Sequence, residues 1–117
     1  MKNRGTAVTF YRRPDGSLTG FVASGHAGYA QWGRDIVCAA ISALTQAALG
    51  GLTDVIGAPV MFDVDEQTGY LEAQLAPEAT SDQMLQAQIL LRTLQGALEQ
   101  MQRNYPQNVR IFFEERR

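Results

Sequence analysis

The sequence has one cysteine and one histidine in 117 residues. A single cysteine cannot form a disulfide within the chain, and an unpaired thiol is typical of proteins that work in a reducing compartment. One cysteine and one histidine also fall short of the three or four ligands that a zinc site uses. We therefore expect neither a bound metal nor another cofactor.

An excess of positive charge is absent as well. Ten basic side chains face twelve acidic ones, which gives a formal net charge of -2, so direct nucleic-acid binding is not expected. Two groups of arginines are candidates for a local basic patch, although arginines at turns and chain ends are more often simply solvated. These groups are Arg12 with Arg13, and Arg110 with Arg116 and Arg117.

Long apolar runs are the third absence. The charged N-terminal residues are not followed by the apolar stretch of a signal peptide, and no run approaches the roughly 20 apolar residues that span a bilayer. From the sequence we expect a soluble, cytoplasmic protein with no membrane partner.

What is present is an ordinary globular composition, with 45% hydrophobic and 19% charged residues. The length is close to the commonest size of one domain and allows a substantial core without disulfides or metals. We expect a single domain over residues 1–117.

Five strands are predicted. Alternating β-prone residues indicate a hairpin of strands 6–12 and 18–24, with Pro14 and Gly16 where a tight turn requires them. A second strand pair is predicted over 58–64 and 70–75, joined by a turn at 65–69. The last strand is predicted over 109–113.

Two helices complete the pattern. The first is predicted over 36–49, between Asp35 as N-cap and Gly50-Gly51 as a stop. The second follows Thr80 and Gln83, which have capping-box spacing, and ends before Pro106. The order ββαββαβ predicts an α+β domain in which two helices cover a sheet.

The second predicted helix carries an apolar stripe at intervals of three and four residues, which is typical of a core-facing helix. Three further apolar residues widen this surface and suit a helix that also meets another subunit. The stripe is Met84, Ala87, Leu91, Leu94, Leu98 and Met101, and the additional residues are Leu85, Ile89 and Leu90.

Cys38 is the candidate nucleophile. With Asp35 as N-cap, Cys38 is the third helical residue, where backbone N–H groups and the helix dipole favour a thiolate. A helix terminus contributes only about 0.3–1 kcal/mol, less than one pKa unit, so a thiol of pKa ~8.5 needs a stronger activator. His26 lies twelve residues earlier, at the end of a predicted strand. A loop of this length allows the imidazole to reach the thiol, as cysteine catalysis requires.

A structural reading of the same two residues stays open. A cysteine followed by Ala39, Ala40 and Ile41 is often a small core residue, and a single histidine in a loop is often solvated. Geometry permits a pair of His26 and Cys38 and does not prove it.

Residues near this pair have two readings each. Asp35 either caps the helix or orients His26. Ser42 lies one turn after Cys38, so its hydroxyl either reaches the site or bonds back to the Cys38 carbonyl. Three loop glycines either act as hinges of a flap that closes on substrate or are plain turn residues. They are Gly25, Gly28 and Gly33.

The segment from Ser24 to Leu44 resembles the signature of the ribosomal-processing cysteine protease family, Prp. It joins Gly-His to Gly-x-Asp-Ile-Val-Cys-Ala-Ala-x-Ser-Ala at that family's spacing. The predicted ββαββαβ order over nearly the whole chain agrees with the family's fold. In the loop, Gln31-Trp32 is bulkier than the family pattern leads us to expect.

The resemblance implies a catalytic dyad of His26 and Cys38, with the family's aspartate and serine at Asp35 and Ser42 and its glycine before the histidine at Gly25. Members of this family are homodimers. They remove a short N-terminal extension from bacterial large-subunit ribosomal protein number twenty-seven, cutting after a Phe-Phe pair. The resemblance therefore implies a cysteine endopeptidase with this peptide as its substrate.

Two other functions are compatible with the residues alone. One is a ribosome-associated binding or assembly factor without catalysis, in which Cys38 is a core residue. The other is a thiol enzyme that transfers acyl groups and leaves peptides intact.

Overall fold

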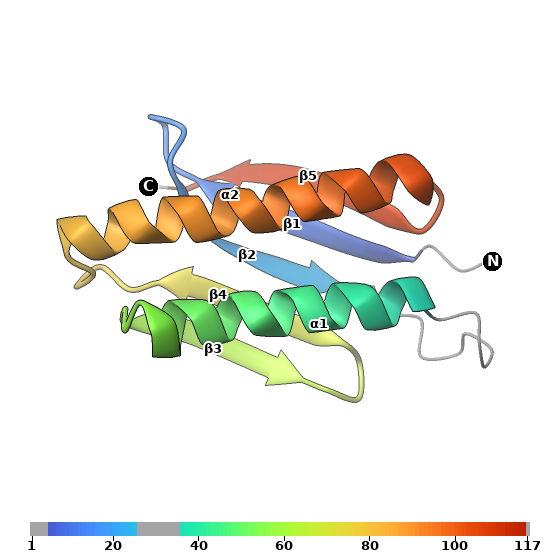
Figure 1. Cartoon of the computed structure of the whole chain (residues 1–117), viewed down its shortest axis with the longest axis horizontal. Helices are drawn as coiled ribbons and strands as arrows, with labels where there is room; N and C mark the ends of the chain where they lie inside the picture. The colour runs from blue at the N-terminus through green and yellow to red at the C-terminus, as the bar shows by residue number, and fades with distance from the viewer. Residues whose placement is uncertain (1–4, 26–35, 117) are drawn as a thin grey trace.

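The computed structural model describes residues 5–25 and 36–116. They form an α+β domain in the predicted order, with a π-helical segment, η1, continuing the first helix (Figure 1). The elements are β1 (Thr6–Arg12), β2 (Leu18–Ser24), α1 (Ile36–Gly50), η1 (Gly51–Val55), β3 (Val60–Asp65), β4 (Tyr70–Leu75), α2 (Ser81–Asn104) and β5 (Val109–Glu115).

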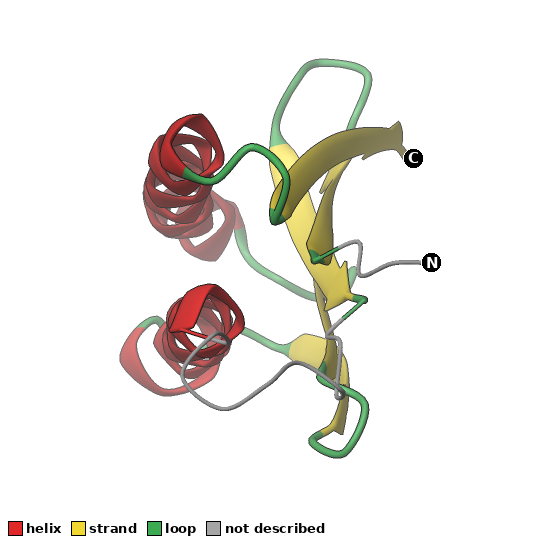
Figure 2. Cartoon of the chain, turned by 90° about the vertical axis from the view of Figure 1, so that its right-hand side faces the viewer, coloured by secondary structure: helices red, strands yellow, loops and turns green. Residues whose placement is uncertain are grey.

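The strands form one mixed sheet in the order β3-β4-β2-β1-β5. The β1–β5 pair is parallel, and the other three neighbouring pairs are antiparallel. Both helices lie on one face of the sheet (Figure 2). This arrangement confirms the predicted fold class, a sheet covered by two helices.

The core lies between this sheet face and the two helices. Residues that lie opposite each other on paired strands are buried there, such as Phe10 with Phe21 and Val8 with Ala23. The stripe predicted on the second helix is confirmed: its four central residues are buried, and Met84 and Met101 pack against the core from its margin. The four buried residues are Ala87, Leu91, Leu94 and Leu98.

The start of α2 has the predicted capping box. Thr80 Oγ1 accepts from the Gln83 N–H at 3.1 Å, and Gln83 Oε1 accepts from the Thr80 N–H at 2.9 Å. Gln83 Nε2 also donates to the Gly57 carbonyl at 3.1 Å. The cap therefore satisfies the helix start and ties it to the chain that leaves η1.

The predicted helix stop at Gly50-Gly51 is wrong. Gly50 has right-handed helical angles, and the helix continues through η1. A Cβ on Gly51 would overlap the Leu90 side chain of α2, so this glycine allows two helical segments to approach closely. The chain turns instead at Gly57, whose φ is +73°, and the Ala58 N–H donates to the Leu52 carbonyl at 2.9 Å.

Because of this continuation, Ile36–Val55 is a helical segment of 20 residues that is long and apolar enough to cross a membrane by length and composition. The expectation that no segment has these properties therefore needs correction. One such helix is weak evidence for a membrane protein, since the core helix of a globular domain has the same composition. Here Ile41 and Leu52 are buried in the core.

Two of the candidate basic-patch arginines pack on aromatic rings. The Arg116 guanidinium lies 3.7 Å from the ring centre of Tyr11, and Arg12 lies 4.7 Å from that of Phe113. The Tyr11 hydroxyl donates to Glu72 at 3.0 Å, and burial together with this carboxylate raises the pKa of Tyr11 to about 12. Arg116 thus covers an aromatic side chain at the end of β5.

Two glycines make the backbone packing testable. A Cβ on Gly20 of β2 would overlap the Ala73 carbonyl of β4, whereas a Cβ on Gly96 of α2 meets nothing within 4 Å. We expect Gly20→Ala to lower the free energy of unfolding by about 1–3 kcal/mol because the paired strands must separate. Gly96→Ala should raise it by up to about 1 kcal/mol, since alanine favours a helix. Urea unfolding measures both, and equal stability of Gly20→Ala and the unmodified protein would contradict the strand packing.

Candidate active site

Cys38 is the third residue of α1, as predicted. Its side chain is 8% exposed and faces the start of β1. The Cys38 Sγ lies 3.5 Å from Thr6 Oγ1 in a buried hydrogen bond in which either atom can be the donor. The thiol therefore lies between the first turn of a helix, where N–H groups lack intrahelical partners, and a hydroxyl on the sheet.

Gly25 brings the end of β2 against the same region. Its φ is +86°, and a Cβ there would lie 2.9 Å from the Gly5 carbonyl oxygen and 3.6 Å from the Ala7 nitrogen. The backbone of Gly25 thus runs directly beside that of Thr6. Three segments distant in sequence meet here: the starts of β1 and α1 and the end of β2, from which the chain continues to His26.

Ser42 lies one turn after Cys38, and both residues line a small cavity of about 10 Å³. This volume corresponds to roughly one water molecule. On this helix the back-bond to a carbonyl is made by Thr45, whose hydroxyl donates to Ile41 at 2.9 Å. The lining also includes Thr6, Ala23, Ile41, Thr45 and Gly69.

A larger polar cavity of about 350 Å³ adjoins this one, and the two share Ser42, Thr45 and Gly69. It extends along α1 to the β3–β4 turn, where Asp65 and Glu66 bring carboxylates to its lining. A space that offers hydrogen-bonding groups therefore lies next to the small cavity at Cys38. The remaining lining residues are Gln46, Val64, Tyr70 and Leu71.

Four of the predicted site residues lie outside the described residues: His26, Gly28, Gly33 and Asp35. Their roles therefore stay predictions, as does the contact of His26 with Cys38. Within residues 5–25 and 36–116, no three side chains of the types that ligate metals are clustered.

Thr6 is a site residue that sequence reasoning did not find. It is 32 positions from Cys38 and carries no motif, so only the packing of α1 on the sheet shows the contact. The same holds for Gly69 at the β3–β4 turn, which reaches the cavity through strand pairing.

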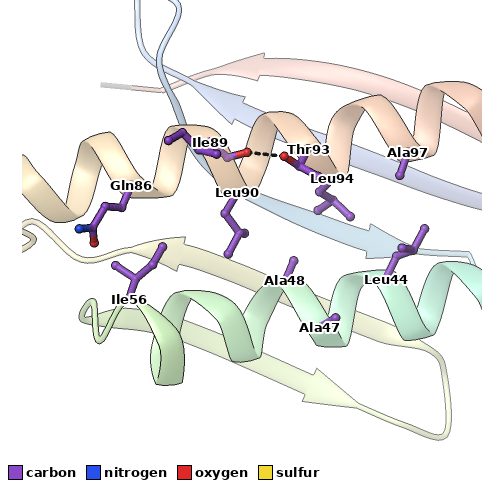
Figure 3. Close-up of a pocket in the computed structure, with 10 residues that line it drawn as sticks. All are labelled: Leu44, Ala47, Ala48, Ile56, Gln86, Ile89, Leu90, Thr93, Leu94 and Ala97. Carbon is purple, nitrogen blue, oxygen red and sulfur yellow. Dashed lines mark hydrogen bonds between the residues drawn. The ribbon is translucent and has the colours of Figure 1, made fainter.

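An apolar groove of about 460 Å³ lies between α1 and α2, and its lining does not include Cys38, Thr6 or Gly69. Figure 3 shows Leu90 and Leu94 of α2 pointing toward Leu44 and Ala48 of α1 across this space. Ile89, at its rim, is 73% exposed. The apolar surface predicted on this helix beyond the core stripe is therefore present.

Gly25 and Gly57 provide a matched test of the junction at Cys38. Both have positive φ, but a Cβ on Gly25 would press on the Gly5 backbone, whereas one on Gly57 meets nothing within 4 Å. Gly57→Ala should lower the free energy of unfolding by about 1–2 kcal/mol, from backbone strain alone. Gly25→Ala should lower it clearly more. Urea unfolding measures both values. Equal losses would contradict the close backbone approach.

Comparisons with known proteins show the family of the chain. The family "Cysteine protease Prp" matches residues 6–110. The ribosomal processing cysteine protease Prp of Bacillus subtilis (strain 168) is 28% identical over 104 residues, covering 89% of this chain and 93% of that protein. The protein of the same name from Staphylococcus aureus (strain NCTC 8325 / PS 47) is 25% identical over 97 residues, covering 83% and 88%.

Solved structures show the same fold. The essential ribosomal processing protease Prp from S. aureus, in complex with a substrate peptide, superposes with a TM-score of 0.79 at 22% identity, covering 93% of this chain and 99% of that one. SMU.848 from Streptococcus mutans gives 0.80 at 27% identity, covering 96% of each chain. With a family match over nearly its whole length, the chain belongs to the cysteine protease Prp family.

Proposed function

We propose that this cysteine protease removes the N-terminal extension of bacterial large-subunit ribosomal protein number twenty-seven, cutting after a Phe-Phe pair. The observation that carries the proposal is the place of Cys38, which lies at the start of α1 and lines a small cavity that adjoins a larger polar one. The names of the B. subtilis and S. aureus relatives supply the ribosomal context.

In the proposed mechanism, His26 takes the proton of Cys38 and the thiolate attacks the scissile carbonyl. His26 then protonates the departing amine, and water releases the product from the enzyme. Backbone N–H groups in the first turn of α1, where the helix dipole favours negative charge, are proposed to stabilise the oxyanion.

Chain connectivity supports the pairing of His26 with Cys38. His26 follows Gly25 directly, the Gly25 backbone runs beside Thr6, and Thr6 touches Cys38 Sγ. The histidine therefore directly follows a residue whose backbone lies beside Thr6, the residue that contacts the thiol. This arrangement reduces the loss of conformational entropy that pairing His26 with Cys38 requires.

The supporting residues have narrower roles. We assign to Asp35 either the helix cap or the orientation of His26, and to Ser42 a contact with the bound peptide, because it lines both cavities at Cys38. Gly28 and Gly33 are proposed as hinges of the loop that closes over the substrate. For Gly25 the packing against Gly5 favours a fixed anchor over a hinge.

The decisive experiment incubates the unprocessed ribosomal protein with the enzyme and reads the product termini by mass spectrometry. We expect one cut after Phe-Phe, and a loss of at least about 1,000-fold in kcat/KM for Cys38→Ala and His26→Ala. Val55→Ala, a change at an 84% exposed position far from the site, is the control and should cleave normally.

Each rival function predicts another outcome. A binding or assembly factor would retain the ribosomal protein without cutting it. An acyl-transferring thiol enzyme would release an acyl group from a thioester and leave the peptide intact. Cleavage by Cys38→Ala at the rate of the unmodified protein would refute the proposed nucleophile.

We also propose that the protein is a homodimer and that the apolar groove between α1 and α2 belongs to the subunit interface. Two apolar side chains on the outer surface of α2, Leu85 and Ile89, are 66% and 73% exposed. A second copy would remove them from water, at roughly 25 cal/mol per Å² of apolar area.

Ile89→Lys tests the interface by placing a charge on it. We expect this variant to sediment as a monomer at concentrations where the unmodified protein is a dimer, because burying an unpaired ammonium is costly. Arg92→Glu changes the charge of an exposed α2 residue outside the groove lining and should leave the dimer intact. A dimer that tolerates Ile89→Lys would place the interface elsewhere.

The proposed location is the cytoplasm. Bacterial ribosomes assemble there, and a single cysteine remains reduced in that compartment.

A further inference from the structure

From the contact between β1 and α1 we infer that Thr6 is a positioning residue, whose hydroxyl donates a hydrogen bond to the thiolate form of Cys38. This inference rests on the proposed function, in which Cys38 is the nucleophile. It adds a group from outside the Ser24–Leu44 segment to the catalytic machinery.

The geometry gives the hydroxyl a defined place. Thr6 Oγ1 lies 3.5 Å from Cys38 Sγ, a distance suited to a hydrogen bond with sulfur, and the two residues are only 4% and 8% exposed. Both line the small cavity at the start of α1. Bulk water therefore competes weakly for either atom.

The backbone that carries Thr6 is held on both sides. The Thr6 N–H donates to the Asn108 carbonyl at 2.9 Å, and Thr6 pairs with Val109 of β5 in the parallel register. On the other side lies the Gly25 backbone. Because the strand is ordered before any substrate arrives, the hydroxyl does not need to reorganise when charge develops on sulfur.

Ionisation of Cys38 decides the direction of the hydrogen bond. With a neutral thiol, either atom can donate, but a thiolate has no proton and accepts only. A hydrogen bond to a charged acceptor is stronger than one between neutral groups. Thr6 therefore favours the charged form and opposes the effect of apolar neighbours such as Ala23 and Ile41.

The test compares three threonine variants by the pH dependence of Cys38 alkylation with iodoacetamide. Thr6→Val keeps the shape and removes the hydroxyl, whereas Thr6→Ser keeps the hydroxyl. Thr9→Val is the matched control, since Thr9 lies on the same strand and faces the opposite side of the sheet from Val8 and Phe10.

We expect Thr6→Val to raise the midpoint of the alkylation profile by about one pH unit and to slow alkylation about tenfold below that midpoint. Peptide cleavage should show a matching fall in kcat with little change in KM. Thr6→Ser and Thr9→Val should follow the unmodified protein. If Thr6→Val does not fold, Thr6→Ala carries the same expectation.

An unchanged alkylation midpoint in a folded Thr6→Val or Thr6→Ala variant overturns the inference. A shift that Thr6→Ser reproduces does so as well, because it would reflect packing and not the hydroxyl. Neither outcome bears on the proposed nucleophile, which is tested by whether Cys38→Ala still cleaves the substrate. The two proposals therefore fail in separate measurements.

Discussion

The close approach of two backbones, at Gly25 and at Gly5–Ala7, is the constraint on which the candidate site depends. It brings the end of β2 beside the start of β1 and leaves no room for a side chain at Gly25. The Thr6 side chain, on the same short segment, reaches the first turn of α1. Gly25 and Ile36, the two described residues that flank the segment containing His26, therefore both lie near the region of Cys38.

The sheet order makes the site end of β1 rigid. This strand is paired with β2 on one side and with β5 on the other, and the parallel β5 partner exists because α2 crosses over from β4 (Figure 1). At the edge of the sheet away from β5, strand β3 is more exposed, and Phe62 on it is 60% exposed. The thiol thus contacts a strand that is paired on both sides. The β3–β4 turn, which borders the polar cavity, lies at the edge of the sheet.

Local patterns predicted most of the fold. The bounds of β1, β2 and β4 match because each strand is marked by alternation and by a nearby turn, and α2 begins where Thr80 and Gln83 form the capping box. The stop at Gly50-Gly51 was wrong because glycine has more than one physical role. Contact with Leu90 of α2, which is distant in sequence, decides that Gly51 serves close packing.

The candidate site, too, was predicted in part by local patterns and in part depends on contacts between distant residues. The third helical position of Cys38 follows from the start of one helix, so the sequence was sufficient. The contact with Thr6 depends on how α1 lies across the sheet, and the shared cavity at Gly69 depends on the pairing of β4 with β2. No local pattern contains that information. The pairing of Cys38 with His26 stays a prediction from loop length and resemblance.

The helix start, the Thr6 hydroxyl and the histidine contribute differently to stabilising a thiolate at Cys38. Lowering the pKa of a thiol from ~8.5 to below ~7 requires about 2 kcal/mol. The start of α1 contributes about 0.3–1 kcal/mol, and a hydrogen bond to a charged group about 1.5–3 kcal/mol. Burial of Cys38 opposes both, because desolvation disfavours the thiolate. In the proposed mechanism the fixed helix and hydroxyl offset the cost of burial, and the imidazolium of His26 provides further stabilisation of the thiolate. A histidine with this role must be close to the sulfur when the thiol ionises and must still deliver its proton to the leaving amine. In the sequence His26 directly follows the anchored Gly25, and this place is compatible with both demands.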